Sequence, residues 1–169
     1  MSDEIVSMKT ATAADGEMVL QLLKQLQLES NVVLIAHLDH MSVQQASADL
    51  DQLSDRDDSI VLLAMYGQQA IGILTVTPDD DQQGELGVAV LKDYWHNGIG
   101  TMLVDEAVYW LNHYSSLNAL KLDVFNDNDR ARAIYKRLGF VATGSRQVKD
   151  AAGKMQMATM MVCRRNIKE

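Results

Sequence analysis

The segment from Glu85 to Phe125 constrains the fold more than any other part of the chain. A strand-like run, Glu85 to Leu91, is followed by a helical run from about Gly98 to Tyr114 and by a second strand-like run, Leu120 to Phe125. Two strands joined through a helix in this way lie parallel in one sheet, with a right-handed crossover. We therefore expect a β-α-β unit in the middle of the chain.

Two helices are expected before this unit. The apolar spacing predicts a strand from about Ile5 to Ala11 and then a helix from Ala13 to Leu28. A second helix should begin after Ser42, which with Gln45 fits a capping box. The intervening segment, Asn31 to His40, is ambiguous, since it fits either an extension of the first helix or a loop.

Two pairs of strands are expected to form antiparallel hairpins. Ser59 to Tyr66 and Ala70 to Thr77 are joined across Gly67–Gln69, a short turn with a glycine. Phe140 to Val148 and Met155 to Arg164 form the second pair, near the end of the chain. Both hairpins lie next to the central unit, so the sheet should be mixed and mostly antiparallel.

One further helix, Asp127 to Leu138 with Gly139 as its C-cap, completes the predicted order βααβββαβαββ. This order is typical of the α+β class, or of α/β by a looser definition, with helices flanking a central sheet. The chain has 169 residues and one proline, and it contains no low-complexity tract or repeat. We therefore expect a single domain over residues 1–169.

Composition excludes several classes of function. The net charge of −8 argues against general nucleic-acid binding, and it either attracts cationic acceptors or serves solubility alone. The apolar runs Val32–Ala36 and Ile60–Met65 are far shorter than the ~20 residues of a membrane helix. The polar start Met1–Glu4 and the single cysteine, Cys163, favour a cytoplasmic protein. No His, Cys or Asp cluster has metal-ligand spacing, so no metal is expected.

The turn into the central helix reads Gly98-Ile99-Gly100-Thr101. A helix N-terminus with nearby glycines suits an anion, because its N–H groups lack partners and the chain can approach a phosphate closely. A tight turn without a ligand fits the same residues. Two nucleotide motifs do not fit, since Leu103 stands where the dinucleotide fingerprint requires glycine and the Walker lysine is missing.

A second motif follows the strand Leu120 to Phe125. Asn128, Ala131 and Tyr135 are spaced i, i+3 and i+7, so they share one face of the predicted helix. An amide and a phenol on one face are unusual for a purely apolar core, although Tyr135 alone also fits a packing role.

Together, the two motifs resemble those of the GNAT superfamily of N-acetyltransferases. Its second motif appears here as Asn128-x-x-Ala131-x-x-Ile134-Tyr135-x-Arg137-x-Gly139-Phe140, with conservative changes at 134 and 137. Its first motif matches at Gly98-Ile99-Gly100, but Trp95 occupies the usual Gln/Arg position, which removes one polar contact. The resemblance covers most of the chain.

The resemblance implies a splayed pair of parallel strands with acetyl-CoA between their C-terminal ends. It assigns the pantetheine arm to the backbone of Val88 and Val90 and to Asn128. It assigns the pyrophosphate to the N–H groups from Trp95 to Thr101. The cofactor-binding residues implied are Val88, Ala89, Val90, Trp95, His96, Asn97, Gly98, Ile99, Gly100, Thr101, Asn128, Ala131 and Tyr135.

The same resemblance implies direct attack by an amine in a ternary complex, without a covalent acyl-enzyme. An amine must lose a proton before it attacks a thioester, and Glu85 is the candidate base, directly or through a water. Glu85 also fits a solvated carboxylate at a strand end. A backbone N–H near Val88 would meet the oxyanion, and Tyr135 would protonate the CoA thiolate. Cys163 is expected to be a buried, inert thiol.

The acceptor is left open between a small amine, such as a polyamine, an aminoglycoside or an amino acid, and a protein N-terminus or lysine. The last hairpin departs from the family pattern at Gly153–Ala158, so it assigns no substrate by analogy. Alternatives are a non-catalytic acyl-CoA-binding regulatory module and a nucleotide-binding signalling domain. We expect a homodimer through the C-terminal strands, with the apolar run Met155–Val162 as an edge that needs cover.

Overall fold

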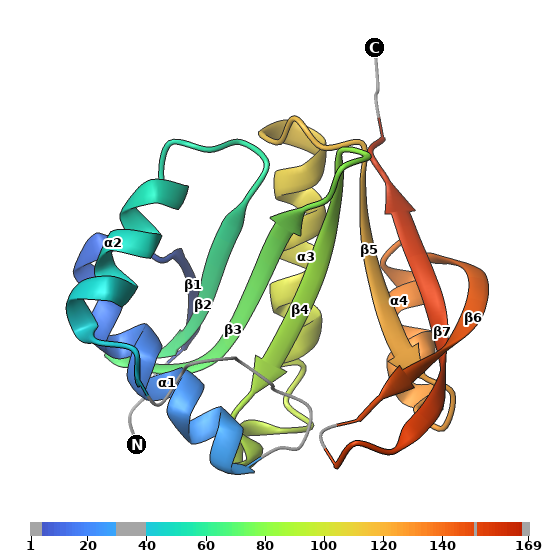
Figure 1. The fold of residues 1–169 in the computed structure, drawn as a ribbon, viewed down its shortest axis with the longest axis horizontal. Helices are drawn as coiled ribbons and strands as arrows, with labels where there is room; N and C mark the ends of the chain where they lie inside the picture. The colour runs from blue at the N-terminus through green and yellow to red at the C-terminus, as the bar shows by residue number, and fades with distance from the viewer. Residues whose placement is uncertain (1–4, 30–39, 151, 167–169) are drawn as a thin grey trace.

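The computed structural model describes residues 5–29, 40–150 and 152–166. A seven-stranded mixed sheet with the strand order β1-β2-β3-β4-β5-β7-β6 forms the centre of the molecule. The helices α1 and α2 lie on one face of this sheet and α3 and α4 on the other (Figure 1). The strands are β1 (Val6–Thr10), β2 (Ile60–Tyr66), β3 (Gln69–Pro78), β4 (Gln83–Val90), β5 (Ala119–Phe125), β6 (Val141–Lys149) and β7 (Met155–Arg164). The helices are α1 (Gly16–Glu29), α2 (Val43–Leu53), α3 (Ile99–His113) and α4 (Asp129–Arg137), with short 3₁₀ turns η1 (Ala13–Asp15) and η3 (Lys92–Tyr94).

The predicted β-α-β unit is confirmed, because β4 and β5 are parallel and joined through α3. Their pairing is limited to the first residues of each strand and ends at Glu85↔Lys121, after which the two strands separate. Every other pair of neighbouring strands is antiparallel. The sheet is therefore mixed and mostly antiparallel, as expected, with one splayed parallel pair.

The paired part of β4 and β5 is closely packed. Gly84 lies in the paired part, and a Cβ at this position would approach Val76 Cγ1 to 2.4 Å and Leu117 Cδ1 to 2.8 Å. A larger residue at this position would force these side chains to move. The strands thus touch at one end and leave room at the other.

The core lies between the sheet and its helices. β2 and β3 are buried over most of their length, and α3 contacts β2, β3, β4 and β5. The fully buried large side chains of the core include Leu26, Leu63, Ile71, Leu74, Leu103, Leu111, Leu120, Phe140 and Met161. This core holds β4 and the start of α3 in fixed positions.

Helix boundaries follow local hydrogen bonds. Ser42 caps α2, since its side chain accepts a hydrogen bond from the Gln45 N–H at 3.1 Å. Asn128 caps α4 by accepting from the Ala131 N–H at 3.1 Å, so this helix begins at Asp129 rather than at Asp127. Gly139 follows the end of α4 with φ +105°, as its predicted capping role requires.

Two predictions about connections have different outcomes. All but the last residue of the ambiguous segment from Asn31 to His40 lies outside the described residues. The prediction that Met155–Val162 is an edge is wrong, because β7 lies between β5 and β6. The chain reverses after β6 and inserts β7 beside β5, so β6 rather than β7 is the edge strand at this end of the sheet.

Candidate active site

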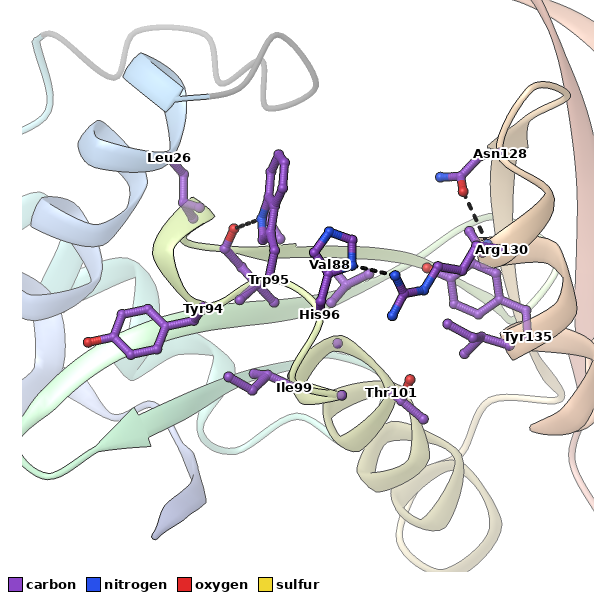
Figure 2. A pocket seen from close by; sticks show the side chains of 16 residues that line it. Leu26, Val88, Tyr94, Trp95, His96, Ile99, Thr101, Asn128, Arg130 and Tyr135 are labelled. Carbon is purple, nitrogen blue, oxygen red and sulfur yellow. Dashed lines mark hydrogen bonds between the residues drawn. The ribbon is translucent and has the colours of Figure 1, made fainter. Parts of the chain in front are cut away.

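A cavity of about 360 Å³ opens where β4 and β5 separate (Figure 2). We call it the first cavity. Residues from β4, from the turn before α3 and from α4 surround it, and part of α1 reaches its side. Its lining includes Leu26, Val88, Ala89, Val90, Tyr94, Trp95, His96, Gly98, Ile99, Gly100, Thr101, Asn128, Arg130, Ala131, Ile134 and Tyr135.

The N-terminus of α3 points its unpartnered groups at this cavity. The helix begins at Ile99, after Gly98, whose φ of 74° lies in the left-handed region that favours glycine. No side chain caps this helix end. In this it differs from α2 and α4, which have side-chain N-caps. A Cβ at Gly100 would lie 4.0 Å from Val90 Cγ2, so no protein atom crowds this face of the turn. The helix end suits a phosphate by charge and by space.

Hydrogen bonds within the turn shape the wall of the first cavity. The Trp95 indole Nε1–H donates to the Val90 carbonyl at 2.7 Å, while its side chain stays 44% exposed. The Trp95 backbone N–H donates to the Lys92 carbonyl at 3.2 Å. Asn97 donates to the Tyr94 and Trp95 carbonyls, each at 3.1 Å. Asn97 is therefore not among the residues that line the cavity.

His96 and Arg130 face each other across the first cavity (Figure 2). Arg130 Nη1 contacts His96 Nδ1, and His96 has a positive φ of 67°. The contact joins the turn before α3 to the first turn of α4. Sequence reasoning missed Arg130, and its position two residues after Asn128 at the start of a helix is the signal that could have found it. Leu26, Tyr94 and Ile134 were also not predicted as lining residues, although Ile134 is a position of the second motif.

Tyr135 lies on α4 with its ring against Phe140, at a centroid distance of 5.7 Å. Burial raises the pKa of Tyr135 above its ordinary value of 10.0. The phenol is thus neutral at neutral pH and can donate a proton. Asn128, Ala131 and Tyr135 come together on the cavity wall, as their spacing predicts.

A second cavity, of about 470 Å³, adjoins the first. Val88, Ala89, Asn128, Ala131 and Tyr135 line both. The remaining wall consists largely of apolar residues of β3, β4 and β5 together with Asp123: Leu23, Ile73, Thr75, Leu86, Gly87, Leu122, Asp123, Val124 and Phe125. Val88 and Tyr135 are therefore at the junction of two spaces.

Glu85 lies apart from Tyr135, in a third cavity of about 370 Å³. Its side chain is 66% exposed, and Oε1 is 3.7 Å from Lys121 Nζ. Lys121 also binds Asp79, and this bond, with a further one from the Gln83 N–H, lowers the pKa of Asp79 to about 2. The third cavity is lined by Gln83, Glu85, Leu86, Lys121, Leu122, Asp123, Thr143, Arg146, Met160, Met161 and Val162, so it shares Leu86, Leu122 and Asp123 with the second.

Comparison with known proteins decides the family. The model of the Acetyltransferase (GNAT) family matches residues 22–140, which run from within α1 through α4 and include both sequence motifs. The chain belongs to the GNAT acetyltransferase family. This family uses acetyl-CoA.

Individual GNAT proteins resemble the chain along most of its length. The L-amino acid N-acetyltransferase AaaT of Escherichia coli K12 is 26% identical over 150 residues, 86% of this chain and 87% of that protein. A GNAT acetyltransferase structure from Streptococcus pneumoniae has a TM-score of 0.85 at 25% identity, and the match covers 96% of this chain and all of that one. The ribosomal L7/L12 α-N-protein acetyltransferase RimL, solved with coenzyme A, has the same fold, with a TM-score of 0.76 at 13% identity over 97% and 96% of the two chains.

Other features of this GNAT chain bear on the remaining sequence predictions. Within residues 5–29, 40–150 and 152–166, no group of three or more His, Cys, Asp or Glu side chains is placed to hold a metal ion. In the same part of the chain, no helix is long and apolar enough to cross a membrane. Cys163 is buried, and burial raises the pKa of its thiol, so it carries little thiolate at neutral pH.

Proposed function

We propose that this protein transfers the acetyl group of acetyl-CoA to a primary amine by direct attack in a ternary complex. The observation that carries the proposal is the uncapped N-terminus of α3 at the cavity between β4 and β5. Its N–H groups would hold the pyrophosphate, and Gly98 and Gly100 leave the backbone accessible. Arg130 and His96, which contact each other across the first cavity, add N–H donors for the phosphates.

The pantetheine arm would run along β4 past Val88 and Val90, where β4 no longer pairs with β5. Backbone groups of a strand edge can hold an extended chain as a further strand would. The Asn128 side chain already accepts from the Ala131 N–H, and its amide nitrogen remains the group to contact the arm. This route ends at Tyr135, which lines the first and second cavities.

The chemistry needs a base and an acid on opposite sides of the thioester. Glu85, directly or through a water, takes a proton from the acceptor amine while the amine nitrogen forms a bond to the acetyl carbon. A backbone N–H near Val88 stabilises the oxyanion. The carbon–sulfur bond then breaks, and Tyr135 gives its proton to the thiolate. The exposure of Glu85 and its separation from Tyr135 favour the route through a water.

The experiment that tests this function follows thiol release from acetyl-CoA over a library of amines that includes amino acids, polyamines and peptides. The relatives suggest these classes, since one acts on L-amino acids and another on a ribosomal protein. Thiol release that requires an acceptor amine supports the proposal. Tight binding of acetyl-CoA without thiol release from any amine would replace it with the non-catalytic acyl-CoA-binding module.

Cofactor binding has its own test in Gly100→Glu. An added side chain at Gly100 finds open space, so the variant should fold, but a carboxylate there repels the phosphates. Calorimetry should show loss of acetyl-CoA binding. Gly144→Glu is the matched control, because its Cβ also has its nearest neighbour at 4.0 Å, Met160 Cε, and it lies on β6. A thermal shift larger for ATP or NAD than for acetyl-CoA would favour a nucleotide-binding domain instead.

A further inference from the structure

Two ion pairs that the proposed chemistry does not use contribute residues to the third cavity. One joins Lys121, which lines the cavity, to Asp79, with Glu85 close by. The other joins Arg146 of β6 to Asp123 of β5. The floor beneath them is apolar, since Leu86, Leu122 and Met161 are buried there and Met160 and Val162 complete the lining. An apolar floor with a few polar groups is the usual make-up of a small-molecule site.

The third cavity shares lining residues with the second, and the second shares Tyr135 with the first. Asp123 lines the second and the third cavities, and Tyr135 lines the first and the second. A ligand that enters the third cavity therefore passes Asp123 before it reaches the side of Tyr135. The amine of an acceptor in this cavity lies inward, and the rest of the molecule lies outward.

The two charges of the Asp123–Arg146 pair are placed in a fixed order along this route. The Asp123 side chain is 29% exposed and lines both cavities, whereas the Arg146 side chain is 59% exposed and lines the outer cavity alone. A ligand thus meets a carboxylate on the inner side and, next to it, a guanidinium on the outer side. Asp123 engages Arg146 through Nη2, and a guanidinium carries five N–H donors in all.

We infer that the acceptor is a free α-amino acid with an apolar side chain. This inference rests on the proposed function. An α-amino acid bears its amine and its carboxylate on one carbon, so its two opposite charges match the adjacent charges of Asp123 and Arg146. The amine lies at Asp123, the α-carboxylate lies at Arg146, and the side chain packs on Met160 and Val162. Guanidinium binds carboxylate with two parallel hydrogen bonds, which makes Arg146 a specificity-determining residue.

Other amines fit the third cavity less well. A polyamine carries several positive charges and no negative one, so its outer charge faces Arg146 and is repelled. A peptide N-terminus has an amide where the carboxylate would be. The net charge of −8 attracts cations to the molecule as a whole, whereas the outer member of the Asp123–Arg146 pair is a cation. Local charge order, rather than net charge, thus selects the acceptor.

The test compares L-leucine, L-leucinamide and spermidine with saturating acetyl-CoA on the wild-type protein. For each probe, kcat/KM for thiol release is extrapolated to the fully deprotonated amine, so that differences in amine pKa do not enter. L-leucine should exceed L-leucinamide by about 10- to 100-fold, the range expected for a hydrogen bond to a charged group. Spermidine should be the poorest of the three.

Arg146→Gln should abolish the preference for L-leucine over L-leucinamide and raise the rate with spermidine, because Asp123 then lacks its cation. Arg146→Lys keeps the charge and should retain part of the preference. Arg56→Gln is the matched control. Arg56 also pairs with an aspartate, with side-chain exposures of 51% and 27% for the two partners, and it lies outside the three cavities. This control should leave the preference unchanged.

Two results would overturn the inference and are distinguishable from each other. Wild-type protein that acetylates L-leucinamide or spermidine at least as well as L-leucine excludes an amino-acid acceptor while it leaves the acetyltransferase function intact. Thiol release with none of the amines, despite binding of acetyl-CoA, overturns the proposed function and this inference together. The first result requires no variant, so it does not depend on how Arg146→Gln folds.

Discussion

The two sides of the sheet are built differently. β2 and β3 are buried at most positions, with α1 on one face and α3 on the other, whereas β6 is exposed at all positions except Val148 (Figure 1). The difference is already present in the sequence, since β3 is mostly apolar from Ala70 to Val76, whereas the middle of β6, Thr143 to Gln147, has no apolar side chain. The first side supplies the core, and the second side supplies an accessible surface. The candidate active site lies at their boundary, where the pairing of β4 and β5 ends.

The largest expected effect is on the rate of acetyl transfer, from a substitution at this boundary. Tyr135→Phe removes the phenolic proton and keeps the ring, so packing against Phe140 is preserved. A general acid contributes ~10²–10⁴-fold, and single-turnover acetyl transfer should slow by a factor in this range while acetyl-CoA affinity changes little. Single-turnover conditions matter because product release can limit kcat. An unchanged chemical step would exclude the general-acid role of Tyr135 and make it a packing residue.

The contrast in burial predicts the next largest effect. Leu74 of β3 is fully buried, and Leu74→Ala should lower the free energy of unfolding by about 2–5 kcal/mol through lost contacts and a cavity. Val141 of β6 is 66% exposed, and Val141→Ala should stay within about 0.5 kcal/mol. Urea unfolding of both variants measures the difference. Equal losses would show that the exposed side is covered in solution.

Local sequence signals predicted the parts of the fold that depend on neighbouring residues. The strand-helix-strand unit, the N-cap at Ser42 and the helical face of Asn128, Ala131 and Tyr135 are all properties of a short window. The same window also holds a cap that the motif did not indicate, since the Asn128 side-chain oxygen closes the first turn of α4.

Contacts between distant segments were beyond prediction from one sequence. The Asp123–Arg146 and Glu85–Lys121 pairs depend on the strand order, which places β5 beside β7 and β4 beside the start of β5. Trp95 stands at a position where the family has a polar residue, and the pattern indicated a lost contact. The structure gives it a different one, the bond from its indole to the carbonyl of Val90, which required the position of β4 to be known.

Association provides a third prediction, since an exposed edge strand invites pairing with another copy. We expect a homodimer through β6, and Val141→Lys should raise its Kd by at least about tenfold, the equivalent of ~1.4 kcal/mol. A charge on an edge strand opposes edge-to-edge pairing. Light scattering at micromolar concentration distinguishes dimer from monomer. A wild-type monomer under these conditions would mean that β6 remains open.

The smallest effect concerns alkaline stability. Burial raises the pKa of Cys163 above its ordinary value of 9.0, so the thiol of the unfolded chain ionises first. Stability from this group is therefore fully present below pH 9 and declines as the pH rises through this value. Between pH 7 and 10, the urea midpoint of unfolding should change with pH by different amounts in the wild type and in Cys163→Ala. Parallel curves would exclude a contribution from Cys163, and Tyr135 would follow the same sign at a higher pH.

Trp95, whose indole is hydrogen-bonded to the Val90 carbonyl, can report ligand binding in the first cavity by its fluorescence. The chain has only two tryptophans, and Trp110 is part of the half-buried face of α3. Trp95 lines the first cavity with its indole hydrogen-bonded and 44% exposed, so a ligand that enters there changes the polarity around the ring. Trp110→Phe would leave Trp95 as the single emitter. Its intensity and emission maximum would then follow occupancy of the cavity directly, without a label or a coupled assay.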